Sequence, residues 1–326
     1  MEKIILKKKN VLKIIGITVG FIIVAGIIGT CYFTGASVFN SSMQMVDNES
    51  TSIENAKAYF KKIDFDLVEF ESKYRVETVQ IKSTLDGHII PADYITVDGD
   101  KNADTIIMVH GLGGSRWTNY PIAGMFLENG YNVISYDQRS SGENTAQYTT
   151  YGYLESHDLE DCTEYLKVSI GDNKKIGVWG TSFGGATVGI YLGSDQANQN
   201  VDFAILDCPM SNMSYMLSTE MEKMDIEIPV DFMMFMGNIF TKMKLGFSYK
   251  DANACNYISE TNVPVLVINS KADEITPYFM GEDIYNSVTH ENKKIFTVED
   301  SAHVEIFFDY PDEYGSNIIE FIKQFP

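Results

Sequence analysis

A short stretch in the middle of the chain limits most strongly what this sequence can fold into. The apolar run Ile176–Trp179 is typical of a buried strand, and the residues that follow Gly184 are typical of a helix. Between them, Gly180 and Gly184 flank Ser182 in the pattern G-x-S-x-G. A strand that turns this sharply into a helix needs small residues on both sides of the bend, and it holds the residue at the bend clear of the sheet. By itself the pattern is weak, because a glycine-rich turn explains it equally well.

Strands and helices alternate on both sides of this turn. Two earlier segments read as a hairpin of strands, and five further apolar runs read as strands separated by helices. This rhythm predicts an α/β fold with right-handed strand–helix–strand units and a mostly parallel sheet flanked by helices. In such sheets, chemistry is found beyond the carboxyl ends of the strands. The predicted strands, besides Ile176–Trp179, are Val76–Ile81, Ile89–Val97, Thr105–Val109, Asn132–Tyr136, Val201–Asp207, Val263–Asn269 and Lys294–Val298.

Three polar residues follow predicted strands at that edge of the sheet. A serine hydroxyl is a poor nucleophile at neutral pH, so it needs a base to take its proton and a third group to orient that base. His303 is our candidate base for Ser182, and Asp273 is our candidate acid. Asp207 also ends a strand and is the rival acid. The simpler alternatives are a helix-capping aspartate at 273 and a surface histidine at 303.

Backbone N–H groups that would receive a developing oxyanion are also predicted. Phe183 follows the serine at the start of a helix, where unpaired N–H groups favour negative charge. The second donor should come from the glycine-rich loop after Thr105–Val109, where we choose Leu112. The alternative for this loop is a tight turn that needs glycine for its shape alone.

The N-terminal segment predicts a membrane helix. Ile14–Phe33 is uncharged and apolar, and twenty residues at about 1.5 Å each span a hydrocarbon core of about 30 Å. Five lysines precede the run, and the next one after it is Lys57, which places the N-terminus in the cytoplasm and the rest outside the cell membrane. Alternatives are a signal peptide cleaved near Thr34–Ser37, a buried helix of a soluble protein, and a lipid attached to Cys31.

Charge and cysteine content exclude some classes of partner. The net charge is −20 although lysines crowd the N-terminus, so we expect no nucleic-acid partner. The four cysteines form no C-x-x-C pair or Cys/His cluster, so we expect no metal, and no other cofactor. A Cys208–Cys255 bridge is conceivable, but free thiols are our expectation.

The strand rhythm breaks between about residues 211 and 260. We expect two or three helices here around Ile228–Pro229, either as a methionine-rich core or as a cap over the site. Eight of the fifteen methionines lie in this segment, at Met213, Met216, Met221, Met224, Met233, Met234, Met236 and Met243.

Residues 75–326 resemble the α/β-hydrolase superfamily, through HGLGG at 110–114, GTSFGG at 180–185, Asp273 and His303. They look most like its bacterial membrane-anchored members in the serine aminopeptidase/monoacylglycerol-lipase group. Those carry D-x-R-x-x-G-x-S/N, seen here as Asp137 to Asn144, although Ser141 replaces the usual histidine. The resemblance also covers Tyr151 to Asp158. It implies serine-hydrolase chemistry without fixing a substrate.

We therefore expect an α/β-hydrolase fold with an N-terminal transmembrane helix and a helical cap. The expected divisions are a tail and anchor at 1–36, a stalk and leading helix at 37–74, and a hydrolase domain at 75–326. The expected activity is cleavage of a carboxylic ester or thioester through an acyl-enzyme, by a monomer acting on a small acyl substrate. The alternatives are a peptidase or aminopeptidase, and a non-catalytic binding domain of the same fold.

Overall fold

The computed structural model describes residues 2–171 and 173–325. The side chains of residues 2–9, among them the predicted cytoplasmic lysines Lys3, Lys7, Lys8 and Lys9, lie outside the described residues. The chain forms two compact units. We call residues 1–42 with 217–248 the helical unit, and residues 43–216 with 249–326 the sheet unit.

The described part of the sheet unit contains one eight-stranded sheet with the strand order β1-β2-β4-β3-β5-β6-β7-β8. Strand β2 runs antiparallel to both of its neighbours, β1 and β4, and the strands β4-β3-β5-β6-β7-β8 are parallel to one another. This confirms the predicted mostly parallel sheet. The strands are β1 (Arg75–Lys82), β2 (Ile89–Thr96), β3 (Thr105–Val109), β4 (Asn132–Tyr136), β5 (Ile176–Thr181), β6 (Phe203–Asp207), β7 (Val265–Ser270) and β8 (Lys293–Val298).

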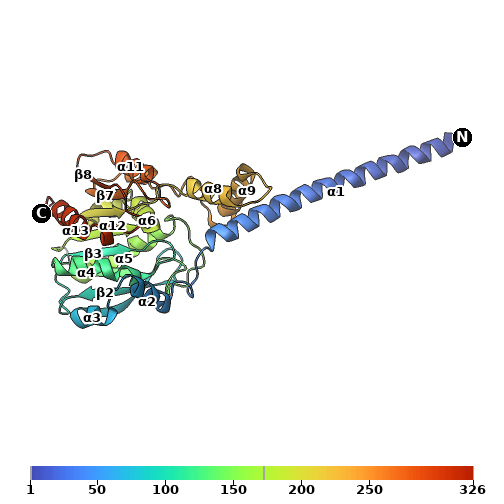
Figure 1. Cartoon of the computed structure of the whole chain (residues 1–326). Helices are drawn as coiled ribbons and strands as arrows, with labels where there is room; N and C mark the ends of the chain where they lie inside the picture. The colour runs from blue at the N-terminus through green and yellow to red at the C-terminus, as the bar shows by residue number, and fades with distance from the viewer. Residues whose placement is uncertain (1, 172, 326) are drawn as a thin grey trace. The chain divides into compact units, whose positions relative to one another are not determined.

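Helices cover both faces of this sheet (Figure 1). In the sheet unit they are α2 (Ile53–Lys62), α3 (Leu67–Lys73), the 3-10 helix η1 (Arg116–Asn119), α4 (Tyr120–Glu128), α5 (Glu155–Ile170), α6 (Phe183–Tyr191), α7 (Asp195–Asn200), α10 (Cys255–Ile258), α11 (Tyr278–Ser287), α12 (Ile306–Asp309) and α13 (Pro311–Ile322). The helical unit contains α1 (Glu2–Met43) up to residue 42, the second half of α8 (Met213–Lys223), and α9 (Val230–Leu245).

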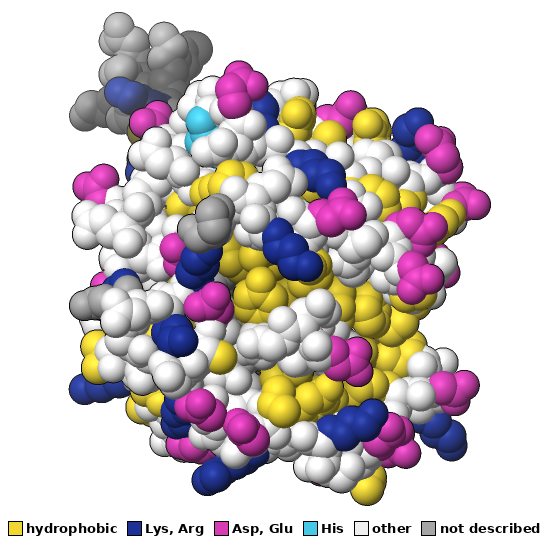
Figure 2. Space-filling view, turned by 90° about the vertical axis from the view of Figure 1, so that its left-hand side faces the viewer, with side chains coloured by type: hydrophobic (Ala, Val, Ile, Leu, Met, Phe, Trp, Pro, Cys, Tyr) yellow, Lys and Arg dark blue, Asp and Glu magenta, His cyan; other side chains and the backbone are white. Residues whose placement is uncertain are grey.

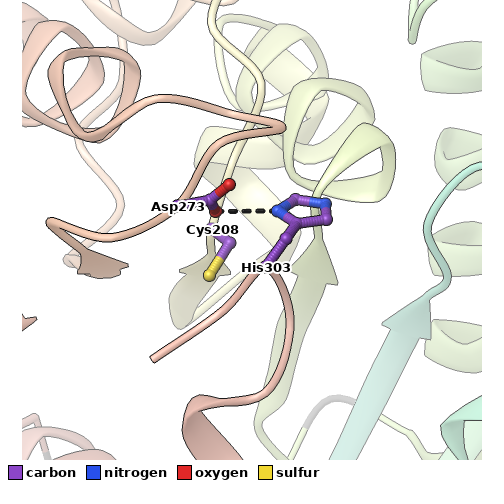
Figure 3. A group of neighbouring side chains, drawn as sticks. All are labelled: Cys208, Asp273 and His303. Atoms are coloured by element: carbon purple, nitrogen blue, oxygen red, sulfur yellow. Dashed lines mark hydrogen bonds and ion pairs between the residues drawn. The ribbon is translucent and has the colours of Figure 1, made fainter. Parts of the chain in front are cut away.

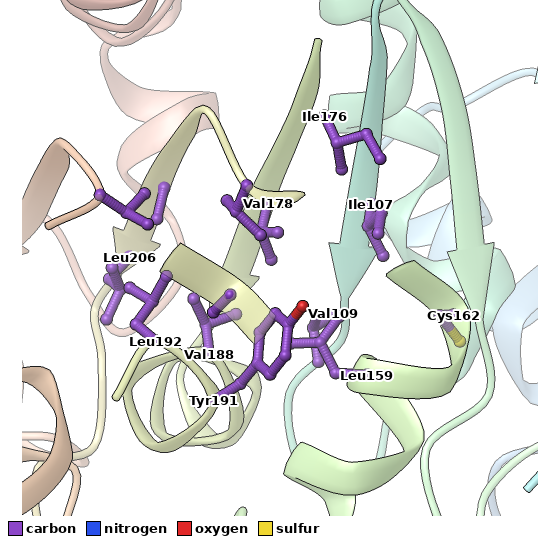
Figure 4. Close-up of a cluster of buried hydrophobic side chains, with 14 of the residues drawn as sticks. Ile107, Val109, Leu159, Cys162, Ile176, Val178, Val188, Tyr191, Leu192 and Leu206 are labelled. Carbon is purple, nitrogen blue, oxygen red and sulfur yellow. The ribbon is translucent and has the colours of Figure 1, made fainter. Parts of the chain in front are cut away.

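One core lies between the sheet and the helices α5 and α6 (Figure 4). Strand residues such as Ile107 and Val178 contribute one side of it, and Leu159 of α5 and Val188 of α6 contribute the other. All four side chains are fully buried. Both faces of the central strands are covered, which explains why their sequences are continuous apolar runs rather than alternating ones.

The opposite face carries a second core, built with α2, α3, α4 and α13. Phe60 of α2 and Phe70 of α3 are buried here, and the Phe70 ring stacks on Tyr120 with ring centroids 4.8 Å apart. The leading helices α2 and α3 are therefore part of the packed sheet unit. Burying aromatic rings of this size supplies a large share of the apolar stabilisation.

A buried ionic cluster fixes the loop that follows β4. The guanidinium of Arg116 donates to Asp93 and Asp137, both buried, and to the more exposed Glu143. Burial raises the pKa of Asp137 to about 6, although Arg116 and two backbone N–H groups oppose the shift. A Cβ on Gly142 would collide with this carboxylate. The Asp137-Gln138-Arg139 segment therefore holds the loop in shape.

Charged side chains are spread over the surface of the face seen in Figure 2. Acidic side chains lie among lysines, arginines and stretches of apolar surface there. The negative net charge is thus dispersed on this face rather than gathered in one patch.

The turn from β5 into α6 depends on close backbone contacts at two glycines. A Cβ on Gly180 would lie 2.6 Å from the carbonyl oxygen of Gly184, and a Cβ on Gly184 would collide with the carbonyl oxygens of Val109 and His110. The obstacles are backbone atoms, so they have little freedom to move aside. This is the physical reason for glycine on both sides of Ser182.

We predict opposite effects for two Gly→Ala substitutions in the sheet unit. Gly184→Ala should lower the free energy of unfolding by at least about 2 kcal/mol, because the new methyl group meets backbone oxygens. Gly124→Ala, inside α4 where a Cβ meets nothing within 4 Å, should raise it by about 0.5–1 kcal/mol. Urea unfolding followed by tryptophan fluorescence measures both, and equal effects would contradict the explanation.

Candidate functional site

Ser182 occupies the bend between β5 and α6 in a strained conformation. Its φ is 55° and its ψ is −117°, values that a residue with a side chain rarely adopts. Its N–H donates to the carbonyl of Asp207 at 2.8 Å, which ties the bend to the end of β6. The strain, of order 1–3 kcal/mol, is typical of functional positions. The hydroxyl is consequently held at the carboxyl edge of the sheet.

His303 and Asp273 converge on this hydroxyl from the loops after β8 and β7. His303 Nε2 lies 2.8 Å from Ser182 Oγ, and His303 Nδ1 lies 2.7 Å from Asp273 Oδ2. Figure 3 shows the carboxylate facing the edge of the imidazole ring. With the proton on Nδ1 donated to Asp273, Nε2 is free to accept the proton of the serine. The structure thus brings the three predicted residues together in one hydrogen-bonded line.

The surroundings of Asp273 keep it ionised. Burial alone would raise the pKa of this carboxyl, but His303 and the N–H groups of Ile275 and Thr276 outweigh burial and lower it. These two N–H groups donate to Asp273 Oδ1 at 2.8 and 2.9 Å. The Thr276 hydroxyl lies 3.0 Å from Asp273 Oδ2 and 3.1 Å from His303 Nδ1. Thr276 is a contact that the sequence analysis did not identify, although a threonine three residues after an aspartate is typical of such a turn.

The rival acid, Asp207, has a different partner. Its Oδ2 accepts a hydrogen bond from the Tyr314 hydroxyl at 3.0 Å, and that hydroxyl in turn accepts from Trp179 Nε1 at 2.9 Å. Burial raises the pKa of Asp207 to about 6. Asp207 therefore anchors α13 beneath the sheet edge, whereas the histidine is hydrogen-bonded to Asp273.

Two residues around the serine have unengaged backbone N–H groups, one in the loop after β3 and one at the start of α6. Among the described residues, the N–H groups of Leu112 and Phe183 donate to no protein acceptor. A Cβ on Gly111 would lie 3.4 Å from Ser182 Cβ, so the loop passes directly against the serine. Leu112 lines the same cavity as Ser182, and Phe183 directly follows the serine, so both residues remain candidates for binding an oxyanion.

His110 fixes the shape of this loop. Its Nδ1–H donates to the Gly111 carbonyl at 2.8 Å, and its Nε2 accepts from the Gln138 N–H at 3.0 Å. The Gln138 side chain continues the network to the His110 carbonyl and to the Thr187 hydroxyl of α6. Complete burial lowers the pKa of His110 to about 4, so the ring is neutral. His110 is therefore a structural histidine of this loop.

A cavity of about 310 Å³ opens at Ser182 and His303 within the sheet unit. One wall comes from the loop after β3, and another comes from α2, through Asn55, Ala56 and Tyr59. No acidic side chain is among the described residues that line it. The methionine-rich segment was one predicted source of apolar surface for the pocket, but no described residue that lines this cavity lies within 211–260, and the apolar surface comes from α2 and its neighbours. No motif in the sequence distinguished α2 from an ordinary amphipathic helix.

The segment before α2 is hydrogen-bonded to the loop after β4. Asn48 Nδ2 donates to the carbonyls of Gly142 and Asn144 at 2.8 and 2.9 Å. The Gly142 N–H donates to the Thr51 hydroxyl at 2.8 Å. These bonds hold Thr51, a residue of the cavity wall, and position the start of α2.

Cys208 lies next to the Asp273–His303 pair. Its sulfur, a carboxylate oxygen of Asp273 and a ring nitrogen of His303 lie within 4.8 Å of one another, as three metal ligands would (Figure 3). Burial raises the pKa of the Cys208 thiol well above its usual range, and a protonated thiol is a poor ligand. The nitrogen and oxygen are already joined by a hydrogen bond, so the donor set does not fit a resident metal. All four cysteines of the chain are free thiols in the structure, as we expected.

Comparisons with known proteins agree with this architecture. Residues 104–243 match the family model described as alpha/beta hydrolase fold. A solved esterase of Pyrococcus furiosus, Pf2001, superposes with a TM-score of 0.61 over 80% of this chain and 96% of its own, at 23% identity. The chain has the α/β-hydrolase fold. An esterase of Exiguobacterium antarcticum, with a TM-score of 0.56 and 18% identity over 76% of this chain and 100% of its own, shares this fold.

Relatives found by sequence align with about as much of this chain as the solved structures do. The uncharacterized protein YqkD of Bacillus subtilis is 26% identical over 235 residues, which are 72% of this chain and 73% of YqkD. At this level of identity, the likeness extends over most of both chains without assigning a substrate.

We predict that replacing each of the two buried aspartates at the sheet edge by asparagine has a different effect on kcat. Asp273→Asn should lower kcat for ester hydrolysis by about 10³–10⁴-fold, because an amide at this position favours the wrong histidine tautomer. Asp207→Asn, the matched control, should change kcat by less than about tenfold, because Asp207 is bonded to Tyr314 instead. Steady-state hydrolysis of p-nitrophenyl butyrate measures both, and a larger loss in Asp207→Asn would reverse the assignment of the acid.

We also predict a pH dependence of stability from Asp207. Its pKa is higher in the folded state, at about 6, than the usual value of 3.8, so the folded state binds the proton more tightly. The unfolding free energy of the wild type relative to Asp207→Asn should therefore fall as the pH rises from 4 to 7, by about 1.4 kcal/mol for each pKa unit of difference. Urea unfolding at several pH values measures this difference, and a value independent of pH would contradict the burial argument.

Proposed function

We propose that this protein is a serine hydrolase that cleaves a carboxylic ester through an acyl-enzyme. The observation that carries the proposal is the line of short contacts from Ser182 Oγ through His303 to Asp273, beside two unengaged N–H groups. The fold of this chain is also that of solved proteins described as esterases.

In the proposed first half-reaction, Ser182 Oγ attacks the acyl carbonyl while His303 Nε2 takes its proton. The carbonyl oxygen becomes an oxyanion that accepts hydrogen bonds from the Leu112 and Phe183 N–H groups. Asp273 holds the Nδ1–H and stabilises the imidazolium that forms. The C–O bond to the alcohol then breaks, and His303 returns the proton to the departing oxygen.

In the second half-reaction, water replaces the alcohol. His303 Nε2 takes a proton from the water, whose oxygen attacks the acyl carbon of the ester with Ser182. The bond to Ser182 Oγ breaks, the serine oxygen recovers the proton from His303, and the acyl group leaves as a carboxylic acid. The substrate, one water molecule and these side chains supply every atom that takes part in the proposed reaction.

The composition of the cavity favours a neutral acyl substrate. An aminopeptidase has to hold the ammonium group of its substrate, and a buried ammonium needs a carboxylate partner. The described cavity wall supplies hydroxyls, two side-chain amides and apolar groups such as Ile122 and Trp179, but no carboxylate. We therefore place an ester first, a thioester next and an aminoacyl amide last.

We also propose that α1 anchors the protein in the cell membrane as a single span. Residues Asn10–Met43 of α1 have a mean hydropathy of 2.6 in their most apolar window, and none of that window is buried. An exposed apolar helix of this length needs a lipid environment. The distribution of lysines around it supports an orientation with the N-terminus in the cytoplasm and the sheet unit outside.

A fluorophosphonate probe tests the proposed nucleophile. The full-length protein should be labelled covalently, and Ser182→Ala should lose labelling while keeping the same far-UV circular dichroism. The matched control Ser115→Ala changes a buried serine that also lies in the cavity wall, and it should still be labelled. An absence of labelling in folded wild type would favour a non-catalytic binding domain.

A substrate panel then separates the reaction classes. We expect turnover of p-nitrophenyl esters, weaker turnover of the matching thioesters, and least of aminoacyl p-nitroanilides. Preferential cleavage of the anilides would favour the peptidase alternative.

Protease accessibility tests the proposed orientation. External protease added to intact spheroplasts should degrade the sheet unit and spare an N-terminal tag, because only the tag would lie in the cytoplasm. A sheet unit that is degraded only after lysis would contradict the outward orientation.

A further inference from the structure

Helix α9 packs against the end of the apolar helix α1 within the helical unit. The Tyr32 ring of α1 meets the Phe240 ring of α9 edge to face, with ring centroids 5.3 Å apart. A Cβ on Gly35 would lie only 2.5 Å from a ring carbon of Phe240 and 3.0 Å from the Met236 carbonyl oxygen. Glycine at position 35 therefore allows the close approach of the two helices.

The pattern of burial gives the direction of α9 along α1. Phe240 lies level with Tyr32 and Gly35, so a parallel α9 would place Met233 two turns further toward the N-terminus, beside Val24–Ile28. Side chains there are exposed, including 54% of Val24 and 63% of Ile28, whereas Met233 is buried. The buried residues of α1 in this unit instead lie on the other side of Tyr32, from Thr34 to Ser42. Helix α9 thus runs antiparallel to α1.

The antiparallel direction determines which residues of α1 lie beside the last turn of α9. Met243 lies one turn beyond Phe240, about 4.5 Å further along the helix, and so reaches the level of the final turns of the apolar run Ile14–Phe33. Its side chain is 75% exposed. Lys242 and Lys244 on either side of it are also exposed, and Gly246 ends the helix.

We propose that this turn, Lys242–Met243–Lys244, docks on the phospholipid bilayer at the end of the span where the chain leaves the membrane. The inference rests on the proposed membrane anchor. A bilayer that surrounds Ile14–Phe33 must also contact the turn of α9 that lies at the same height along α1. Met243 enters the outer edge of the acyl region, and the two ammonium groups reach lipid phosphates from aliphatic stems, as lysines near membranes do. In a chain of net charge −20, this turn carries two positive charges and no negative one.

The charge and the apolar tip together favour lipid over water or a protein partner. Lysines at a helix C-terminus also interact favourably with the helix dipole, which explains their charge but not an exposed methionine between them. The proposed contact makes α9, an insertion between β6 and β7 in the sequence, a second membrane contact besides α1.

Lipid quenching of a fluorophore tests the proposal on the full-length protein. In a background with Cys31 and Cys255 replaced by serine, Met243→Cys is labelled with nitrobenzoxadiazole and reconstituted in vesicles of phosphatidylcholine and phosphatidylglycerol. Phosphatidylcholine that carries a nitroxide near the top of its acyl chain should quench this label several-fold more than it quenches a label at Val168→Cys. Val168 is 85% exposed on α5 of the sheet unit and serves as the water reference, and Val19→Cys, within α1, serves as the membrane reference.

The possible outcomes distinguish a failure of the proposed docking from a failure of the proposed membrane anchor. Quenching at 19 but not at 243 overturns the docking and leaves the anchor in place, whereas quenching at neither position overturns both. A blue-shifted label at 243 that lipid nitroxides do not quench means burial against protein, such as a second copy, and overturns the docking. Lys242→Glu with Lys244→Glu should halve the quenching at 243 or reduce it further, and unchanged quenching overturns the phosphate contact. None of these readouts depends on esterase activity.

Discussion

The close approach of β5, α6 and the loop after β3 is the constraint on which the site depends. Three backbone segments meet at Ser182, and they can do so only because Gly180 and Gly184 have no side chains. Ser182 has its positive φ at this meeting point, and Gly111, in the loop that also carries Leu112, lies against the serine there. Strain in the backbone and the geometry of the site therefore have one cause. The packed cores on both faces of the sheet supply the stabilisation that offsets this strain.

Much of this arrangement could be predicted because it depends on local rules. Runs such as Thr105–Val109 and Asn132–Tyr136 matched their strands residue for residue, since a strand covered on both faces must be apolar throughout. Parallel strands then bring their carboxyl ends to one edge, so the order of the strands alone placed residues 182, 273 and 303 at the same edge. No knowledge of their contacts was needed for that step.

What escaped the sequence analysis depends on packing between distant segments. Asp207 ends one strand and Asp273 follows the next, and their three-dimensional partners, Tyr314 for Asp207 and His303 for Asp273, show how they differ. The role of α2 in the cavity wall was equally hidden, because Asn55 and Tyr59 follow no motif and reach the site through the fold of the second core. The end of α1 was also unexpected. The helix continues to Met43, through a segment that its polar composition suggested was a stalk, because Val38 and Phe39 find buried positions.

The hydrogen bonds of Asn48 and Thr51 have a consequence for where the chain can be cut without damage to the cavity. A protease that cuts within residues 34–42 would release a fragment that still carries the entire wall of the cavity, from Ser50 onward. A cut within α2 would instead separate Ser50, Thr51 and Asn55 from the rest of the cavity wall. The position of the cut relative to α2 thus decides whether the fragment keeps a complete cavity wall.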